Sequence, residues 1–342
     1  MAVTMQKIAE LAHVSRGTVD RALNRRPGVD PEVAARIREI AKELGYVPGR
    51  AGRALSTRKR PVRLGLLLNS AGNPFYAEVL RGVHAARQSY ADFNIELDIR
   101  EVKGYDPATQ LESLESLAEG GIQALVLTPI NEQAVADRID LLAQSGIPVV
   151  TLNSDIENTR RMCYVGCNYL ASGQTAAGML RLLAENGARV GIVTGSVRML
   201  GHNQRIAGFR DGIRAYPDAQ ITVVDIAENN DDDETSYRVT RAMLEAHPEI
   251  DAVYFTAGGT AGGVRAIAEL REDGYPTVIT CDATPEIRGL VGAGKIHATI
   301  CQQPYEQGFL AVKLLLDRVL FGQTPADDCC YMQNEIKIRE NI

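Results

Sequence analysis

Apolar residues near the N-terminus recur at helical spacing in three short segments. The first begins after Thr4 and the second, 16–23, begins after Ser15, because both residues favour helix N-caps. The third follows Asp30 and has a proline at its first helical position. Two short helices about one turn apart predict a helix-turn-helix, and the third helix completes a small core. The positions expected to face inward are Ile8, Leu11 and Ala12, then Val19, Ala22 and Leu23, then Val33, Ile37, Ile40, Ala41 and Leu44.

From about residue 61 the pattern changes to continuous apolar runs that alternate with amphipathic segments. Continuous apolar strands between helices are typical of parallel sheets that are covered on both faces. The pattern therefore predicts an α/β body of two doubly wound parallel-sheet subdomains that face each other across a cleft. A helix is expected near 76–90, and strands are expected at 63–69, 95–100, 124–128, 148–152, 190–194, 252–255 and 277–281.

Charge is distributed unevenly along the chain. The formal net charge is −6, but residues 1–60 hold 13 Lys and Arg against 6 Asp and Glu. The remaining residues hold 24 against 37, so the basic N-terminal part precedes an acidic body. This asymmetry is expected when one module meets a polyanion, and a solvated basic face is the alternative.

Composition excludes several classes of protein. Hydrophobic residues make up 45% of the 342 positions and charged residues 23%, a balance typical of a globular protein with more than one core. No apolar run approaches the ~18 residues of a membrane span, and no signal peptide is evident. The six cysteines all lie after residue 160, in apolar surroundings. We therefore expect a cytoplasmic protein with reduced cysteines and no membrane partner.

The second predicted helix has the chemistry of a DNA-reading helix. Arg16 and Arg21 can bond guanine at two points, whereas Ser15 and Thr18 suit phosphate contacts. Asp20 either accepts from a cytosine amine or orients Arg16 or Arg21. A three-helix module that binds protein is the alternative, and the local excess of basic residues disfavours it.

Three segments of this region, 4–9, 14–24 and 45–48, resemble the DNA-binding head of the lactose/galactose repressor family. The resemblance implies a transcriptional repressor. It also implies that the segment after residue 48, too rich in glycine for a stable helix alone, folds as a hinge helix on DNA, with Leu55 wedged into the minor groove and Arg53 near the backbone. The DNA-binding residues expected are Thr4, Ser15, Arg16, Gly17, Thr18, Arg21, Asn24, Arg50, Arg53 and Leu55.

Polar residues follow the predicted strands of the body. Amide, carboxylate, guanidinium and hydroxyl groups occur together at these strand ends, for example at 69–73, 153–155 and 302–303. Loops at the carboxyl ends of parallel strands line the cleft of such folds. Groups that both donate and accept suit the hydroxyls of a small polyol.

The body resembles the periplasmic sugar-binding fold of this repressor family, and the ribose-type binding proteins in particular. The segments that carry the likeness are 73–76, 147–152, 205–209, 281–285 and 298–304. The resemblance implies that Phe75 stacks on a sugar ring and that Arg205 and Asp282 bond its oxygens. The effector-binding residues expected are Asn73, Phe75, Tyr76, Thr128, Asn153, His202, Arg205, Ala257, Asp282 and Gln302.

Two departures bear on the ligand. Asn153 stands where the ribose-type proteins usually have Asp, and 256–260 lacks their usual Asn-Asp pair. The ligand is thus expected to be a sugar or sugar derivative, larger or differently substituted than a simple pentose. A non-sugar effector in the same cleft, or a sugar-binding module whose head contacts protein, is the alternative.

The resemblance also implies domain boundaries. They are a helix-turn-helix domain at 1–47, a hinge helix and linker at 48–60, and an effector-binding and dimerisation domain at 61–342. Within the last, the N-subdomain is expected at about 61–164 and 299–328, and the C-subdomain at about 165–298 and 329–342.

Other kinds of site are disfavoured. Segment 258–263 is similar to a dinucleotide turn, but Thr260 takes the place of its middle glycine. A phosphate on the effector, held at the N-terminus of the following helix, is a weaker hypothesis. Cys163 and Cys167 have metal-like spacing without further ligands, and 231–234 is expected to cap a helix at the cleft rim. We expect no catalytic residue, no metal and no cofactor.

The partners follow from these assignments. A palindromic operator in double-stranded DNA requires two heads, so a homodimer through the body is expected. The sequence ends at Ile342 without a leucine-heptad tail, so we do not expect a tetramer that forms through such a tail. Whether the effector releases the operator or strengthens binding is left open.

Overall fold

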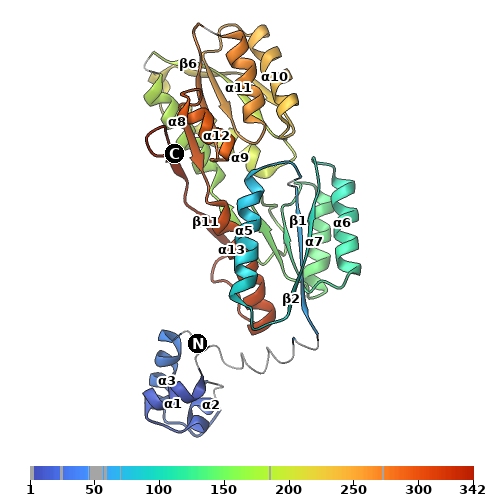
Figure 1. Ribbon diagram of the computed structural model, residues 1–342, viewed down its shortest axis with the longest axis vertical. Helices are drawn as coiled ribbons and strands as arrows, with labels where there is room; N and C mark the ends of the chain where they lie inside the picture. Colours follow the sequence, from blue (N-terminus) through green and yellow to red (C-terminus); the bar gives the residue numbers. More distant parts are fainter. Residues whose placement is uncertain are drawn as a thin grey trace. The chain divides into compact units, whose positions relative to one another are not determined.

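The computed structural model describes residues 4–23, 26–44, 46, 57, 60–69, 71–184, 186–271 and 273–342. These residues form two compact units (Figure 1). The smaller is Met1–Pro61 with Asp92–Asn94, and the larger is Val62–Ala91 with Ile95–Ile342.

The smaller unit contains three helices, α1 (Met5–Ala12), α2 (Arg16–Leu23) and α3 (Pro31–Glu43). The expected caps are present. The Thr4 hydroxyl accepts from the Lys7 amide, and the Asp30 carboxylate accepts from the amides of Glu32 and Val33. The three helices share a core around Ile8, Val19 and Ile37. Leu11 was expected in this core but is 43% exposed, and the buried residues of α1 are Ile8, Ala9 and Ala12.

The larger unit contains two six-stranded sheets within the described residues. Both follow the doubly wound order, in which the first strand of the subdomain lies between the second and the third. In the first sheet the order is β11 (Cys329–Met332), β5 (Cys163–Cys167), β4 (Val149–Leu152), β3 (Ala124–Leu127), β1 (Val62–Leu68) and β2 (Ile95–Glu101). In the second it is β12 (Glu335–Lys337), β10 (Ala298–Cys301), β9 (Thr277–Cys281), β8 (Ala252–Phe255), β6 (Ala188–Thr194) and β7 (Ile221–Glu228).

The sheets are parallel apart from one edge strand. β12 runs antiparallel to β10, and the other described pairs are parallel. Most central strands are buried along their whole length, as continuous apolar sequence predicts.

Helices cover the faces of both sheets (Figure 1). In the first subdomain α5 packs on α13 and α6 on α7, and in the second α8 packs on α9 and α10 on α11. A 3₁₀ turn, Pro217–Ala219, precedes β7. The helix bounds are α5 (Phe75–Ser89), α6 (Pro107–Glu119), α7 (Gln133–Gln144), α8 (Tyr169–Leu183), α9 (Leu200–Arg214), α10 (Asp233–Ala246), α11 (Thr260–Leu270), α12 (Pro285–Gly292) and α13 (Pro304–Phe321).

Glycines allow two of these helix pairs to approach closely. A Cβ atom at Gly82 of α5 would lie 2.0 Å from the Tyr305 carbonyl oxygen of α13. At Gly173 of α8 it would lie 2.1 Å from the Arg205 carbonyl oxygen of α9. Only glycine fits at such a backbone contact. The α8–α9 contact fixes the helix turn that carries Arg205.

The strands expected from the sequence are all present, but the expected subdomain boundaries shift. Segment 329–332 was placed in the second subdomain, whereas it forms β11 and pairs in parallel with β5 of the first sheet. β10 belongs to the second sheet, through β9. The chain therefore passes between subdomains after β5, after β10 and between β11 and β12. Strand pairing, which local apolar pattern does not encode, sets these crossings.

Across the described residues, no helix is both long and apolar enough to span a bilayer.

Candidate functional site

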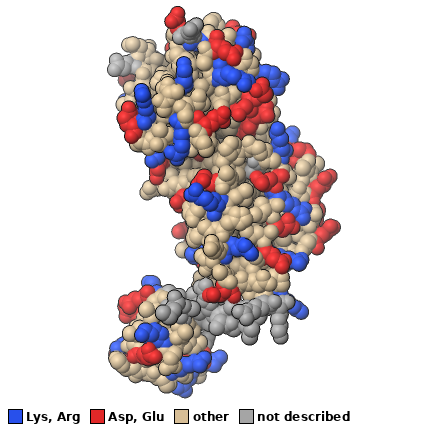
Figure 2. Space-filling view, in the orientation of Figure 1, with Lys and Arg blue, Asp and Glu red and all other residues tan. Residues whose placement is uncertain are grey.

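The expected DNA-reading face lies on α2 of the smaller unit. Arg16, Gly17 and Arg21 are exposed. Figure 2 shows Lys and Arg side chains on the visible face of this unit. Ser15 caps the helix, because its hydroxyl accepts from the Thr18 amide at 3.1 Å and lies 2.9 Å from the Thr18 hydroxyl. The hydroxyls of Ser15 and Thr18 both lie at the start of α2, where a phosphate contact was expected.

Asp20 forms an ion pair near the end of α2. Its carboxylate accepts from Nη1 of Arg26 at 3.2 Å. Thr4 is the cap of α1, as described above. The other expected DNA-binding residues, Asn24, Arg50, Arg53 and Leu55, lie outside the described residues.

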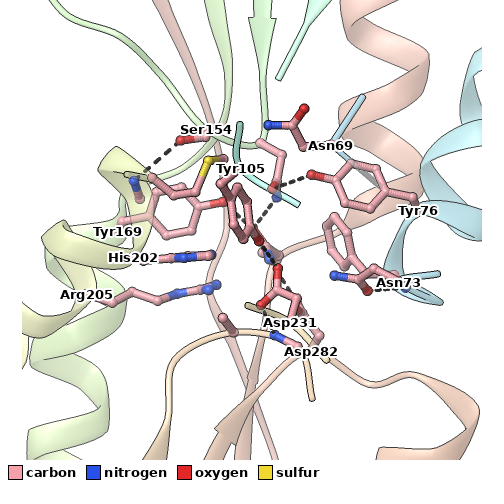
Figure 3. A pocket seen from close by; sticks show the side chains of 17 residues that line it. Asn69, Asn73, Tyr76, Tyr105, Ser154, Tyr169, His202, Arg205, Asp231 and Asp282 are labelled. Atoms are coloured by element: carbon pink, nitrogen blue, oxygen red, sulfur yellow. Dashed lines mark hydrogen bonds between the residues drawn. The ribbon is translucent and has the colours of Figure 1, made fainter. Parts of the chain in front are cut away.

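The expected effector residues meet in a pocket of the larger unit, between its two subdomains (Figure 3). They come from loops and helix starts at the carboxyl ends of the strands, as the topology requires. The expected residues that line the pocket are Asn73, Phe75, Tyr76, Asn153, His202, Arg205, Ala257, Asp282 and Gln302.

Thr128 was expected in this set but does not line the pocket. It is fully buried at the end of β3, and its carbonyl oxygen accepts from Nε2 of Gln110 at 3.0 Å. Gln110 is also buried, and its Nε2 lies 3.1 Å from Oδ1 of the pocket residue Asn69. Thr128 therefore lies one layer behind the pocket wall.

Arg205 is the charged centre of the pocket. The residue is 3% exposed, and its Nη1 donates to the Thr256 carbonyl oxygen at 2.6 Å. Its guanidinium carbon lies 4.5 Å from the centroid of the Tyr169 ring, at cation–π distance. Nε and Nη2 have no hydrogen-bond partner within the described part of the chain. A buried guanidinium with two unused donors is costly unless a ligand accepts from them.

A chain of hydrogen bonds connects the polar groups opposite Arg205. Nε2 of Gln302 donates to Oδ1 of Asp282 at 2.9 Å, and the Tyr169 hydroxyl donates to Oε1 of Gln302 at 3.0 Å. Nδ2 of Asn153 lies 3.3 Å from the same Oε1, and the Tyr76 hydroxyl donates to Oδ1 of Asn153 at 3.1 Å. Burial raises the pKa of the Asp282 carboxyl above its usual value. The network fixes these side chains from both subdomains.

Backbone strain is concentrated at the same strand ends. Asn153 after β4, Asp282 after β9 and Gln303 after β10 have φ values of 63°, 70° and 55°. Such left-handed conformations are uncommon for residues other than glycine, and they cluster at functional sites. Here they turn the chain sharply out of the strand, so that the Asn153 and Asp282 side chains line the pocket.

His202 of α9 also lines the pocket. Its Nδ1 lies 3.0 Å from the Ser196 amide nitrogen and 3.2 Å from the Ser196 carbonyl oxygen. Burial lowers the pKa of the imidazole below its usual value. A second positive charge beside Arg205 is therefore disfavoured.

Contacts across the pocket hold the subdomains together. The Tyr105 hydroxyl, from the loop after β2, donates to the Asp231 carboxylate of the second subdomain (Figure 3). Beside it, Nζ of Lys103 lies 3.7 Å from Asp232, and Nη1 of Arg198 donates to the Tyr105 carbonyl oxygen at 3.1 Å. The cavity left is about 30 Å³, whereas ligand pockets begin near 300 Å³. A sugar ring therefore fits only if these contacts between the two subdomains break.

Sequence reasoning missed several lining residues. Tyr105 lies in an irregular loop and Tyr169 at the start of α8, and neither belongs to the motifs that pointed to the cleft. The 231–234 run was expected to cap a helix at the rim. Asp232 does cap α10, by accepting from the Thr235 amide at 2.9 Å, while Asp231 turns into the pocket. Asn69 and Ser154 lie in the polar strand ends 69–73 and 153–155 that the sequence indicated, and the remaining additions are Met199, Gly201 and Gly258.

Cys163 and Cys167 are both buried in β5, and the Cys163 sulfur lies 3.6 Å from that of Cys330. Among the described residues, no group of three or more His, Cys, Asp or Glu side chains is placed to hold a metal ion.

These features define a two-subdomain ligand-binding body attached to a helix-turn-helix module. Residues 64–324 match the family model described as periplasmic binding protein domain, and residues 4–49 match that of bacterial regulatory proteins, lacI family. The chain belongs to the periplasmic-binding-protein domain family, and it is a DNA-binding transcriptional regulator of the lacI type. The family is one of regulators and binding proteins.

Relatives span the same two parts. The chain is 27% identical to the HTH-type transcriptional regulator CelR of Thermobifida fusca, over 99% of this chain and 98% of that protein. It is 28% identical to the ribose operon repressor of Haemophilus influenzae, over 92% of each. A solved glucose-galactose binding protein from Geobacillus stearothermophilus, GanP, aligns with a TM-score of 0.76 and 23% identity, over 83% of this chain and 99% of that one. The last likeness concerns the fold.

Proposed function

We propose that this protein is a repressor that binds a palindromic operator as a homodimer and responds to a sugar or sugar derivative bound between the subdomains of its body. The observation that carries the ligand proposal is Arg205, a buried guanidinium with two donors unused within the described residues. Sugar hydroxyls and ring oxygens accept hydrogen bonds, and Phe75 and Tyr76 offer ring faces and edges beside them.

The relatives support a sugar in particular. Their printed names include a ribose operon repressor and a D-ribose/D-allose-binding protein of Pseudomonas aeruginosa. The pocket contains amide, carboxylate, hydroxyl and guanidinium groups, the mixture that hydroxyls with both donor and acceptor capacity require. A regulator that binds both DNA and a sugar needs access to both ligands, and we therefore propose that the protein acts in the cytoplasm.

The DNA proposal rests on α2. Arg16 and Arg21 project from its exposed side, at the helix that enters the major groove in a helix-turn-helix. Ligand binding in the body would shift the two subdomains, because Tyr105, Lys103 and Arg198 must release their present partners. We propose that this shift changes the affinity of the dimer for its operator.

Thermal unfolding of the full chain tests the ligand proposal. D-ribose, D-allose, D-glucose and D-galactose are titrated from micromolar to millimolar concentration, with sucrose as the control because sucrose stabilises proteins by exclusion from their surface. A specific ligand raises the melting temperature along a curve that keeps rising with the logarithm of its concentration, and it adds about 2.7 kcal/mol of stability at 100 times its Kd. Curves that all match sucrose would contradict a sugar effector.

A further inference from the structure

The start of α11 forms one wall of the pocket, and its chemistry limits what the pocket can bind. Gly258 lines the pocket, and α11 begins two residues later at Thr260. Free amide groups and the helix dipole make such a helix start attractive to phosphate or carboxylate. A phosphorylated effector would therefore be expected to place its anionic group here.

The protein's own carboxylates occupy these amides. The Gly258 amide donates to Oδ1 of Asp231 at 2.9 Å, and the Gly262 amide donates to Oδ1 of Asp233 at 3.0 Å. The fit is tight, because a Cβ atom at Gly262 would lie 1.8 Å from the Asp233 carbonyl oxygen. Asn229 holds the loop in place, since its Oδ1 accepts from the Asp231 amide and its Nδ2 donates to the Gly258 carbonyl oxygen.

Charge in the pocket is also unfavourable to an anion. Of the described residues that line it, two are carboxylates, Asp231 and Asp282, and one is a guanidinium, Arg205. His202 adds no charge while its imidazole is neutral. A sugar phosphate would bring its negative charge into a small pocket beside both carboxylates, where repulsion is less screened than in bulk water.

An uncharged hydroxyl, by contrast, matches Asp231. Oδ2 of that carboxylate already accepts from the Tyr105 hydroxyl, which reaches it from the first subdomain (Figure 3). A ligand hydroxyl could replace the phenol without any change in charge. Arg205, on the same side of the cleft, would then donate from its unused Nε and Nη2 atoms to other ligand oxygens.

We propose that Asp231 is a specificity-determining residue, which makes the cleft selective for uncharged polyhydroxylated ligands over phosphorylated or carboxylated sugars. The proposal rests on the proposed function, because it assigns a ligand class to the same pocket. It also argues against the hypothesis of an effector phosphate at the start of α11.

Calorimetric titration of the full chain tests the proposal. The probes are D-ribose, D-glucose and D-galactose, each compared with an anionic counterpart: D-ribose 5-phosphate, D-glucose 6-phosphate and D-galacturonate. The expected result is that at least one uncharged sugar binds and that its anionic counterpart binds at least 100-fold more weakly. In Asp231→Asn, which keeps the shape of the side chain and removes its charge, that ratio falls at least tenfold.

Asp232→Asn is the matched control. Asp232 caps α10 and faces Lys103 without lining the pocket, and asparagine preserves the cap. Loss of the Lys103 contact across the pocket should change the affinities for both sugars of a pair alike, so this variant should keep the wild-type ratio. Asp231→Ser, which also lacks the charge, provides a second measurement if Asp231→Asn does not fold.

The outcomes distinguish a failure of the proposed role of Asp231 from a failure of the proposed sugar effector. A phosphorylated or carboxylated sugar that binds wild-type protein as tightly as its parent sugar overturns the role of Asp231 but leaves a sugar effector in place. An unchanged ratio in both Asp231 variants does the same. If no member of the panel binds, the sugar effector and this inference fall together.

Discussion

At the scale of single residues, the pocket contains groups that the folded chain alone does not satisfy. Arg205 is 3% exposed and uses Nη1 on Thr256, yet Nε and Nη2 have no partner among the described residues. If the two unused donors make the buried guanidinium costly, replacing it with an apolar side chain of similar size removes the cost of dehydrating the charge and should leave the stability unchanged or raise it. Binding and stability should therefore respond oppositely at this position.

Arg205→Met is expected to weaken binding of the sugar ligand at least 100-fold, because two charge-assisted hydrogen bonds are lost. Its melting temperature without ligand should equal or exceed that of wild type. Calorimetry and thermal unfolding measure the two quantities. Arg210→Met, at an exposed position of the same helix, is the control. A large loss of stability in Arg205→Met would show that the guanidinium is structural instead.

His202 predicts how stability depends on pH. Burial lowers the pKa of its imidazole in the folded protein, so below the unfolded value of about 6.5 the unfolded chain binds the proton more strongly. The stability that His202 contributes is therefore present above that value and is lost as the pH falls through its lowered folded pKa.

The melting temperature should decrease from pH 7.5 to 5, and His202→Gln should flatten the decrease. His297, whose pKa burial also lowers, should account for part of the remaining slope. The exposed His84 provides the control variant, His84→Gln, with a wild-type profile. Parallel profiles for wild type and His202→Gln would contradict the assignment.

At the scale of elements, the sequence predicted the central strands well and the crossings between subdomains poorly. Fully buried strands such as β3 and β4 are continuous apolar runs, which are visible without a partner. β11 is a half-exposed edge strand, and its place beside β5 depends on tertiary pairing. Tyr105 was missed for the same reason, because only closure of the cleft brings its loop to Asp231.

The α8–α9 contact predicts a difference between two glycines of one helix. A Cβ atom at Gly173 would lie 2.1 Å from the Arg205 carbonyl oxygen, whereas at Gly178 it would meet nothing within 4 Å. Gly173→Ala should cost about 2 kcal/mol or more and weaken sugar binding, because α9 and Arg205 must move. Gly178→Ala should stabilise by roughly 0.4–1 kcal/mol.

Denaturant unfolding and calorimetry test this pair. The glycines lie five residues apart in α8, so helix propensity alone would give both variants a similar gain. Equal stability of the two variants would show that the two helices can separate without consequence for the pocket.

At the scale of the whole molecule, the chain joins a DNA-binding module to a two-subdomain ligand-binding body. The sequence was sufficient to predict both parts, because capping residues and motif spacing are local. Nine of the ten expected pocket residues meet in the structure, all within the described residues. The sequence did not indicate that side-chain contacts join the two walls of the cleft. In the structure its walls are joined by Tyr105, Asn153 and Gln302, so ligand binding and subdomain movement must be coupled.

We propose that a ligand bound between the two subdomains controls DNA binding. Duplexes enriched by the full chain from a random-sequence library supply the operator, and fluorescence anisotropy measures its affinity with and without the sugar that binds. We expect a palindromic sequence and an affinity that changes at least tenfold with saturating sugar, in either direction, in wild type but not in Arg205→Met. An affinity that stays the same in wild type while the sugar is bound would contradict the account.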